Sequence, residues 1–363
     1  MNKRRLEKLA RNFPDSGIQL LFEDPLNVRD ALNIAAPDFV DRIDFSQLER
    51  IRATFVLKNF RKRESDLVFT APFDARRGRR KKAITIYILI EHQSDPDPLM
   101  GFRMLFYMML IWDKQREQWM KDHKSYRGFR FQPILPLVFY TGRKEWKSLD
   151  GLMERMAFAE TFEEFIPDPK LLFLNLRDTP PDTIIEQGGW FGWLMRVVQA
   201  RQSSLAEFRA VVREATEQLE AMPEKQKNRW LNLVSFMEAL IYHYRDADEV
   251  PVIQQEIEDV VESQEYLKEI EAMKNSYAQT LKRAGKREGK REGKREGKRE
   301  GKREGKLDGQ QKILIRQLSQ KFGGISVEVT RIIESTQDEE QLELWLDKVL
   351  FTESIDDFDF SAN

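Results

Sequence analysis

The hydrophobic pattern of the chain first predicts strands. Three segments between residues 51 and 90 are short, rich in β-branched and aromatic residues, and bounded by polar stretches, as is typical of strands. They read IRATFVL (51–57), SDLVFTAPF (65–73) and AITIYILI (83–90). The basic loop DARRGRRKK separates the last two, and two or three strands forming an antiparallel meander are predicted. Two more strand-like runs follow, PILPLVFYTG (133–142) and KLLFLNL (170–176).

Helical spacing dominates the rest of the chain. Residues 15–36 are interrupted by Asp24-Pro25, which predicts two short helices meeting at a bend. Residues 98–119 predict a helix with one apolar face, formed by Phe102, Leu105, Phe106, Met109 and Trp112. Nearly all of the segment 183–280 is predicted to be helical and amphipathic. Its expected core residues are Trp190, Trp193, Leu205, Phe208, Leu231, Val234 and Phe236.

A low-complexity segment follows, in which GKRE occurs five times in register from Gly285 to Glu304. Like charges stack four residues apart on a helix, which is unfavourable, whereas Glu288 and Arg291 have the favourable i,i+3 spacing. Each glycine costs about 1 kcal/mol of helix propensity relative to alanine. Helix and coil are therefore nearly balanced, and we interpret the repeat as a spacer.

Beyond the spacer, residues 310–351 predict a small unit of two or three helices. Gly323-Gly324 is expected to end the first helix. Thr336 and Glu339 form a predicted capping box at the start of the last one.

Composition excludes several kinds of site. The 363 residues are long enough for more than one domain, and 33% charged with 41% apolar residues is ordinary for a soluble protein. No cysteine is present, which excludes disulfides and cysteine-based metal sites, and three histidines are too few for a histidine-rich zinc site. The longest apolar stretch, GFRMLFYMMLIW, is too short to span a bilayer. The basic N-terminus lacks the apolar core of a secretory signal, so we expect a cytoplasmic protein with no membrane partner.

Charge is distributed unevenly although the net charge is −1. Residues 281–306 carry thirteen Lys or Arg against five Glu, a local +8, and residues 307–363 carry five against twelve, a local −7. The loop RRGRRKK (76–82) and the spacer both carry cations that could neutralise DNA phosphates. For the spacer, a solvated segment attracted to the acidic tail is an equally good interpretation.

The segment IYILIEHQ (86–93) carries the main chemical signal. Strand alternation places Glu91 and Gln93 on one face, about 7 Å apart, and His92 on the other, where a satisfied buried histidine is expected. An ionised carboxylate at the end of a buried strand is costly unless something compensates it. Pairing with the strand that opens at Asp66 would bring two carboxylates within about 4–6 Å. Such a site suits Mg²⁺, which would offset the cost of burying Glu91; polar residues that simply end a strand are the alternative.

Four segments in combination resemble the bacterial recombination-promoting nuclease family, also classed as transposase-like. They are PDSGIQLLFEDP, RESDLVF, IYILIEHQSDPDPLMGFRMLFYMMLIW and PILPLVFYTG. The resemblance covers residues 13–145 and, more loosely, 146–250. That family is similar to a divergent branch of the PD-(D/E)XK restriction-endonuclease-like superfamily. The core order of that superfamily, αβββαβ, matches the order predicted above.

The resemblance implies roles for individual residues. Asp66 corresponds to the metal-binding aspartate, Glu91 to the second acidic ligand, Gln93 to the position of the catalytic lysine, and Asp15 to a further acidic site residue. This sequence departs from the family where Pro14-Asp15 and Ile18-Gln19 replace a His-Asp and a Phe-Lys pair. Gln93 also cannot supply a positive charge.

Arg103 and Tyr107 match an arginine and a tyrosine of the helix that follows. Arg103 either binds a DNA phosphate bidentately or forms a structural ion pair with a carboxylate, and the sequence leaves both open. Tyr107 is expected to pack. The C-terminal tail resembles a small helical domain of unknown function that follows such nuclease domains.

These observations predict an α/β (α+β) protein with a restriction-endonuclease-like core. The expected divisions are a core (13–180), a helical extension (181–280), a spacer (281–309) and a C-terminal helical domain (310–363). The expected function is Mg²⁺-dependent DNA endonuclease activity in recombination or mobile-element biology. The alternative is a non-catalytic DNA-binding or assembly protein on the same scaffold. A homo-oligomer is left open.

Overall fold

The computed structural model describes residues 13, 15–51, 67–74, 83–355, 358 and 360. The chain divides into two compact units, Met1–Leu281 and Lys282–Asn363. The boundaries expected at residues 180 and 309 stay predictions.

The first unit is built on a five-stranded mixed sheet, which confirms the predicted fold class. Its strands are β1 (Glu49–Ile51), β2 (Leu67–Asp74), β3 (Ala83–Gln93), β4 (Ile134–Tyr140) and β5 (Leu172–Asn175), in the order β1-β2-β3-β4-β5. β1, β2 and β3 are antiparallel neighbours, which confirms the meander for the segments 65–73 and 83–90, whereas β4 and β5 run parallel to β3. The segment 52–57 and the basic loop 76–82 lie outside the described residues.

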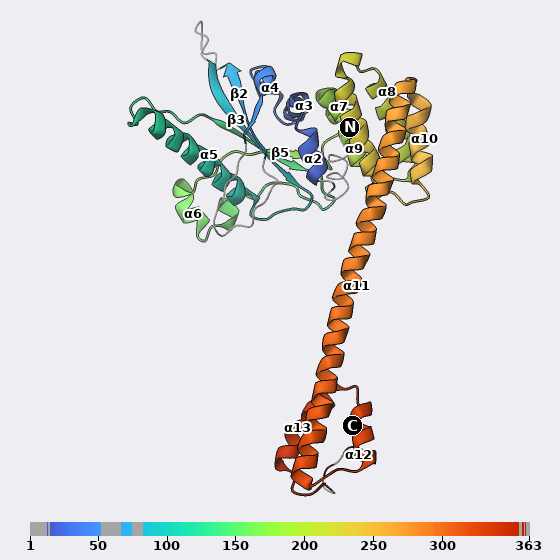
Figure 1. Cartoon of the computed structure of the whole chain (residues 1–363). Helices are drawn as coiled ribbons and strands as arrows, with labels where there is room; N and C mark the ends of the chain where they lie inside the picture. Colours follow the sequence, from blue (N-terminus) through green and yellow to red (C-terminus); the bar gives the residue numbers. More distant parts are fainter. Residues whose placement is uncertain are drawn as a thin grey trace. The chain divides into compact units, whose positions relative to one another are not determined.

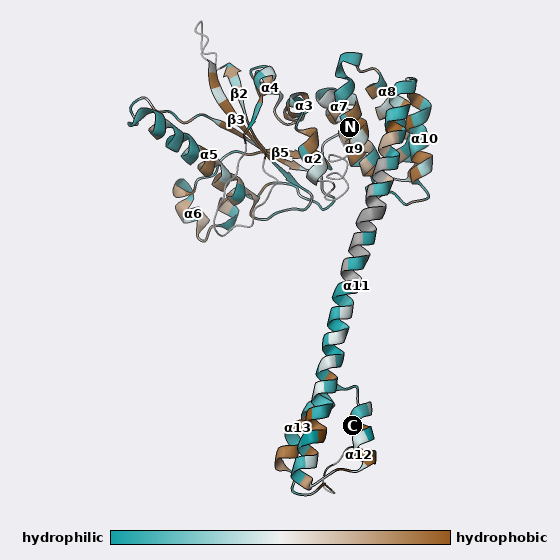
Figure 2. Ribbon diagram, viewed as in Figure 1, coloured by the Kyte–Doolittle hydropathy of each residue, from teal (hydrophilic) through white to brown (hydrophobic). Residues whose placement is uncertain are grey.

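Both faces of the sheet are covered by helices (Figure 1). Ile88 and Ile90 of β3 pack with α2 (Asp15–Leu21), α3 (Pro25–Ala35) and α4 (Pro37–Val40). Leu89 packs on the opposite face against α5 (Met100–His123). Because β3 is buried on both faces, its sequence is continuously apolar instead of alternating. Figure 2 shows this as brown colour along the central strands.

The bend predicted at Asp24-Pro25 is confirmed. Asp24 is the N-cap of α3, and its Oδ1 accepts a hydrogen bond of 2.9 Å from the Leu26 amide. Pro25 occupies the first helical position, where its missing N–H is not needed.

The predicted apolar face of α5 is wrong. The side chains that face the sheet are Met100, Met104, Met108 and Ile111. Phe102 and Met109 are instead 48% and 55% exposed. Two helical stripes of similar hydrophobicity lie side by side on this helix, and the unbranched methionines fill the irregular space over the sheet.

The helices after the sheet pack into the same core as α3. They are α7 (Pro181–Ala200), α8 (Leu205–Glu220), α9 (Lys227–Tyr244) and α10 (Val250–Val260). Of the expected core residues, Phe208, Leu231, Val234 and Phe236 are buried, and Trp190, Trp193 and Leu205 pack against them half-buried. Between Leu152 and Ile166, η2 (Met153–Arg155), α6 (Ala159–Phe162) and η3 (Glu163–Phe165) are short helical turns.

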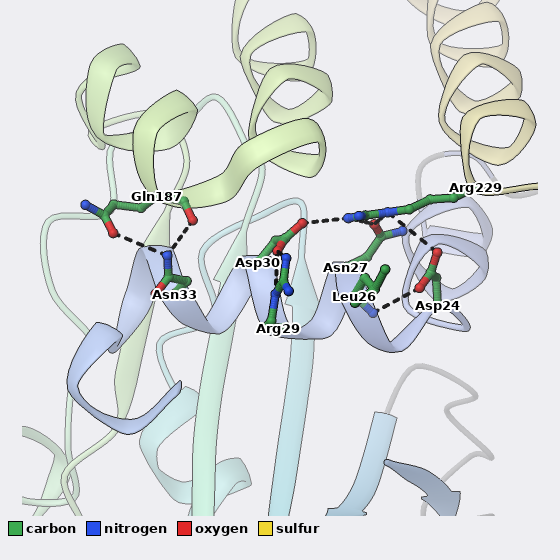
Figure 3. Close-up of polar contacts among 8 residues, drawn as sticks. All are labelled: Asp24, Leu26, Asn27, Arg29, Asp30, Asn33, Gln187 and Arg229. Atoms are coloured by element: carbon green, nitrogen blue, oxygen red, sulfur yellow. Dashed lines mark hydrogen bonds and ion pairs between the residues drawn. The ribbon is translucent and has the colours of Figure 1, made fainter. Parts of the chain in front are cut away.

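A buried polar cluster ties α9 to α3 (Figure 3). Arg229, 5% exposed, donates to Asp30 Oδ2 at 2.6 Å and to Asn27 Oδ1 at 2.9 and 3.1 Å. Asn27 in turn donates to the Leu21 carbonyl at 2.8 Å. Each buried polar side chain therefore has a partner, which removes most of the cost of burying it.

The long helix α11 (Gln264–Phe322) contains the whole GKRE repeat, so the helical alternative holds in this structure. The repeat is teal and white in Figure 2 where its residues are coloured. α11 ends before Gly323, whose φ of 76° is the left-handed conformation expected there.

The second unit has its own helical core, as predicted for the C-terminal tail. The end of α11 packs with α12 (Val327–Ser335) and α13 (Glu339–Phe351) around Leu314, Leu342 and Trp345. The predicted capping box at Thr336 is wrong, because the N-cap of α13 is Asp338. Its Oδ1 accepts from the Glu340 and Gln341 amides at 2.9 and 3.3 Å.

Candidate active site

The polar residues of IYILIEHQ lie at the C-terminal end of β3, the central strand of the sheet. Glu91 pairs with Val138 and Gln93 with Tyr140 of the parallel strand β4. The Thr141 amide donates to the Gln93 carbonyl at 3.0 Å, so both strands end together. Glu91 is fully buried, at 0% exposure, which is unusual for an acidic residue.

Arg103 and Gln93 stabilise the buried Glu91 carboxylate. Arg103, in the first turn of α5, forms an ion pair with Glu91 Oε1 through Nη2, and the Gln93 side chain donates to the same oxygen at 2.9 Å. Burial disfavours the charged guanidinium, but attraction to Glu91 and the hydrogen bond to Asp97 outweigh it and raise the pKa of Arg103. The structural ion pair, one of two alternatives for Arg103, is therefore present; contact with a phosphate stays a prediction.

Asp97 is a member of the site that sequence reasoning missed. Its Oδ2 accepts from Arg103 Nη1, so Arg103 bridges two carboxylates, while its Oδ1 accepts from the Leu99 amide at 2.9 Å. The second contact fixes the loop that leads into α5. The DPDP tetrad (95–98) could have indicated this residue, because it places aspartates in a turn directly before a helix.

His92 points to the other face of the sheet, as predicted. It is 6% exposed, and its Nε2 lies 2.8 Å from Thr141 Oγ1. Its ring packs 5.8 Å from that of Phe139. His92 is therefore a buried, hydrogen-bonded residue of the sheet and not part of the Glu91 cluster.

The side chains of the other predicted acids, Asp66 and Asp15, lie outside the described part of the chain. Asp66 is outside the described residues; Leu67, the residue after it, pairs with Ile90. Asp15 begins α2, but its side chain is outside the described part. Tyr107 packs half-buried among the residues beneath α5, as expected.

Two side chains at the end of β3 carry oxygen atoms that could bind a hard divalent cation. The Glu91 carboxylate and the Gln93 amide oxygen are ligands of the type that Mg²⁺ prefers. Because Gln93 donates its amide group to Glu91, its own oxygen stays available as an acceptor. Among the described residues, no group of three or more His, Cys, Asp or Glu side chains is arranged to hold a metal.

Comparison with curated proteins finds relatives over part of the chain. Recombination-promoting nuclease RpnC of Escherichia coli (strain K12) is 22% identical over 159 residues, which is 44% of this chain and 48% of the relative. Recombination-promoting nuclease RpnD of Escherichia coli O157:H7 is 29% identical over 121 residues, 33% of this chain and 42% of the relative. The chain thus spans less than half the length of either protein. No solved structure matches, and no helix of the described residues is long and apolar enough to cross a membrane.

The family comparison covers more of the sequence. The model described as "Putative transposase, YhgA-like" matches residues 14–229, from the start of α2 to Arg229 of the buried polar cluster. The match includes the sheet, the Glu91 cluster and α5. The chain belongs to the YhgA-like transposase family.

Proposed function

We propose that this protein is a metal-dependent DNA endonuclease that hydrolyses phosphodiester bonds in recombination or mobile-element biology. The observation that carries the proposal is Glu91, a fully buried carboxylate held by Arg103 and Gln93 at the end of a central strand. Active sites often bury and pair ionisable residues, and here the buried carboxylate lies beside a second polar side chain, Gln93, at a strand end. The nuclease names of the two relatives support the same activity.

Asp66 and Glu91 are the proposed metal ligands. Leu67 pairs with Ile90, and Asp66 and Glu91 are the next residues along the two antiparallel strand sequences. Val68 packs on the α5 face together with Leu89. We therefore propose that Asp66 continues this alternation and shares a face with Glu91. A bound Mg²⁺ would polarise a phosphoryl oxygen and lower the pKa of an attacking water.

Gln93 and Arg103 are proposed to orient the substrate. The amide oxygen of Gln93 can accept a hydrogen bond from the attacking water and so direct it towards phosphorus. Arg103 has five N–H donors; the contacts to Glu91 and Asp97 use one on each terminal nitrogen, and the guanidinium also forms a hydrogen bond with Tyr107. The remaining donors suit a phosphate oxygen of the cleaved strand. Asp15 is proposed as a further acidic residue of the site.

One observation favours the non-catalytic alternative. Arg103 already neutralises Glu91, so the described cluster is stable without further chemistry, and Gln93 brings no positive charge to it. A DNA-binding protein that retained the scaffold would show the same contacts.

Plasmid cleavage distinguishes the two functions. Supercoiled plasmid incubated with the protein and Mg²⁺ or Mn²⁺ should be nicked, and EDTA, Glu91→Gln or Asp66→Asn should abolish nicking. Glu238→Gln, a substitution at a buried carboxyl in α9, is the matched control and should cleave like wild type. Circular dichroism verifies that each variant folds. If folded wild-type protein binds DNA but stays inert with every divalent ion tested, the nuclease proposal is lost and the non-catalytic function remains.

A further inference from the structure

The segment that follows α5 has an unusual composition. Residues 124–131, KSYRGFRF, contain three cations and three aromatic residues, and no Asp or Glu occurs between Asp122 and Glu145. We call residues 124–131 the tip segment. It follows the C-terminal end of α5, whereas Arg103 of the Glu91 cluster lies in the first turn of the same helix.

The backbone of the tip segment is held in place by the helix. Trp119 of α5 donates from Nε1 to the Ser125 carbonyl at 2.6 Å, and Arg116 donates to the Tyr126 hydroxyl at 3.0 Å. Directly after the segment, the Trp112 indole donates to the Gln132 carbonyl at 3.1 Å. The tip segment is thus fixed at both ends, so presenting a surface there requires little ordering on binding.

The aromatic rings of the tip segment contact one another, and part of this cluster is exposed to solvent. Phe129 is half-buried, with its ring centroid 5.6 Å from that of Trp119 and 4.7 Å from that of Phe131. Tyr126 and Phe131 remain 51% and 54% exposed. Two aromatic rings that are each about half exposed therefore pack on a half-buried aromatic base.

The cations of the tip segment have no acidic partner among the described residues. No ion pair within that part of the chain reaches Lys124, Arg127 or Arg130. The Arg130 guanidinium donates to the neighbouring Phe129 carbonyl at 2.8 Å. Three cations beside two exposed rings match the chemistry of a nucleic-acid strand, which offers phosphates and base faces at regular intervals.

We propose that the tip segment binds an unpaired DNA strand, with bases stacked on Tyr126 and Phe131 and phosphates paired with Arg127 and Arg130. Only the choice of DNA rests on the proposed nuclease function. A duplex hides its base faces, so the exposed rings favour unpaired over paired DNA. Twenty residues of α5 separate Arg103 from His123, which is roughly 30 Å of helix. That length corresponds to roughly nine base pairs, so the favoured substrate has an unpaired stretch about that far from the cut.

The test is DNA binding by the full-length chain in EDTA, where no cleavage occurs. Fluorescence anisotropy with a labelled (dT)30 strand and with a 30-base-pair duplex gives affinity against salt concentration. Each lost ring should weaken binding of the single strand at least about fivefold, so Tyr126→Ala/Phe131→Ala should weaken it at least about thirtyfold and affect the duplex much less. Arg127→Gln/Arg130→Gln should reduce the slope of log affinity against log salt by about 1.4 for the single strand.

Three variants make the test specific. Tyr126→Phe keeps the ring and loses only the hydrogen bond from Arg116, so it should bind like wild type. Phe158→Ala removes an aromatic side chain that is 81% exposed on another segment, and Arg331→Gln removes an exposed arginine of the second unit; neither should change binding.

Several results would overturn the proposal: wild-type protein that binds no single strand, double variants that match these controls, or equal losses on single strand and duplex. If binding behaves as expected but plasmid is never cut, the tip-segment proposal stands and only the nuclease activity fails.

Discussion

Replacement of Glu238 by glutamine should stabilise the first unit at neutral and alkaline pH. Glu238 of α9 is 3% exposed and accepts a hydrogen bond of 2.6 Å from Gln254 of α10. Burial raises the pKa of its carboxyl from 4.5 to about 7, against the opposing effects of the Gln254 hydrogen bond and of Lys274; Glu258 adds to the increase.

The magnitude follows from these two pKa values. At about 1.4 kcal/mol for each pKa unit, ionising Glu238 costs about 3 kcal/mol more in the folded protein than in the unfolded chain. The folded state therefore binds more protons between pH 4.5 and about 7, and stability contributed by the neutral acid is lost as pH rises through that window. Glutamine has the shape of the protonated acid and does not ionise. The advantage of Glu238→Gln should be near zero at pH 4.5 and reach about 3 kcal/mol at pH 8.

Thermal unfolding measured by tryptophan fluorescence from pH 4.5 to 8.5 tests this expectation. Six of the seven tryptophans belong to the first unit, so the signal reports mainly that unit. A difference of 3 kcal/mol corresponds to a rise in Tm of roughly 6–10 °C at pH 8. Glu217→Gln, at a half-exposed position of α8, is the matched control and should change Tm by less than about 2 °C. A difference between Glu238→Gln and wild type that does not vary with pH would refute the reasoning.

Two further predictions concern α5 and α11. Arg103→Met leaves the buried Glu91 carboxylate without its guanidinium, so urea unfolding should show a loss of about 3 kcal/mol. Most of that loss should return in Arg103→Met/Glu91→Met; failure to recover would show that the ion pair is not the cause. Gly101→Ala should cost about 1–3 kcal/mol in the same assay, because a Cβ there would lie 2.4 Å from the Asp150 carbonyl oxygen. Gly309→Ala, where a Cβ meets open space, should instead stabilise α11 by up to about 1 kcal/mol, and equal effects at both glycines would contradict this account.

The sequence predicted the sheet and its polar end because both depend on local pattern. A run such as IYILI is buried on both faces wherever it lies in a sheet, and strand alternation alone separated Glu91 from His92. The bend at Asp24-Pro25 was predictable for the same reason, since capping and the proline ring act on adjacent residues.

The buried face of α5 and the partners of Arg103 could not be predicted, because they depend on contacts between segments that are distant in sequence. The periodicity of a single segment carries no information about such contacts. Phe102 and Met104 have equally good helical spacing, and only the packing of α5 on β3 decides which one is buried. Likewise, Arg103 forms ion pairs with carboxylates because the fold brings Glu91 and Asp97 next to the first turn of α5. The role of Asp66 stays a prediction, since that residue is outside the described part.

The cluster in Figure 3 has a consequence for dissecting the protein. A fragment ending near residue 180 would keep Asp30, 4% exposed, and its contact with Arg29, but would lose the buried Arg229 guanidinium that binds Asp30 Oδ2 in the intact chain. It would also uncover the apolar side of α3 that α7 now shields, so such a truncation should aggregate when expressed. If that fragment failed to cleave DNA, the cause would be misfolding of the first unit, and the result would carry no information about the catalytic groups.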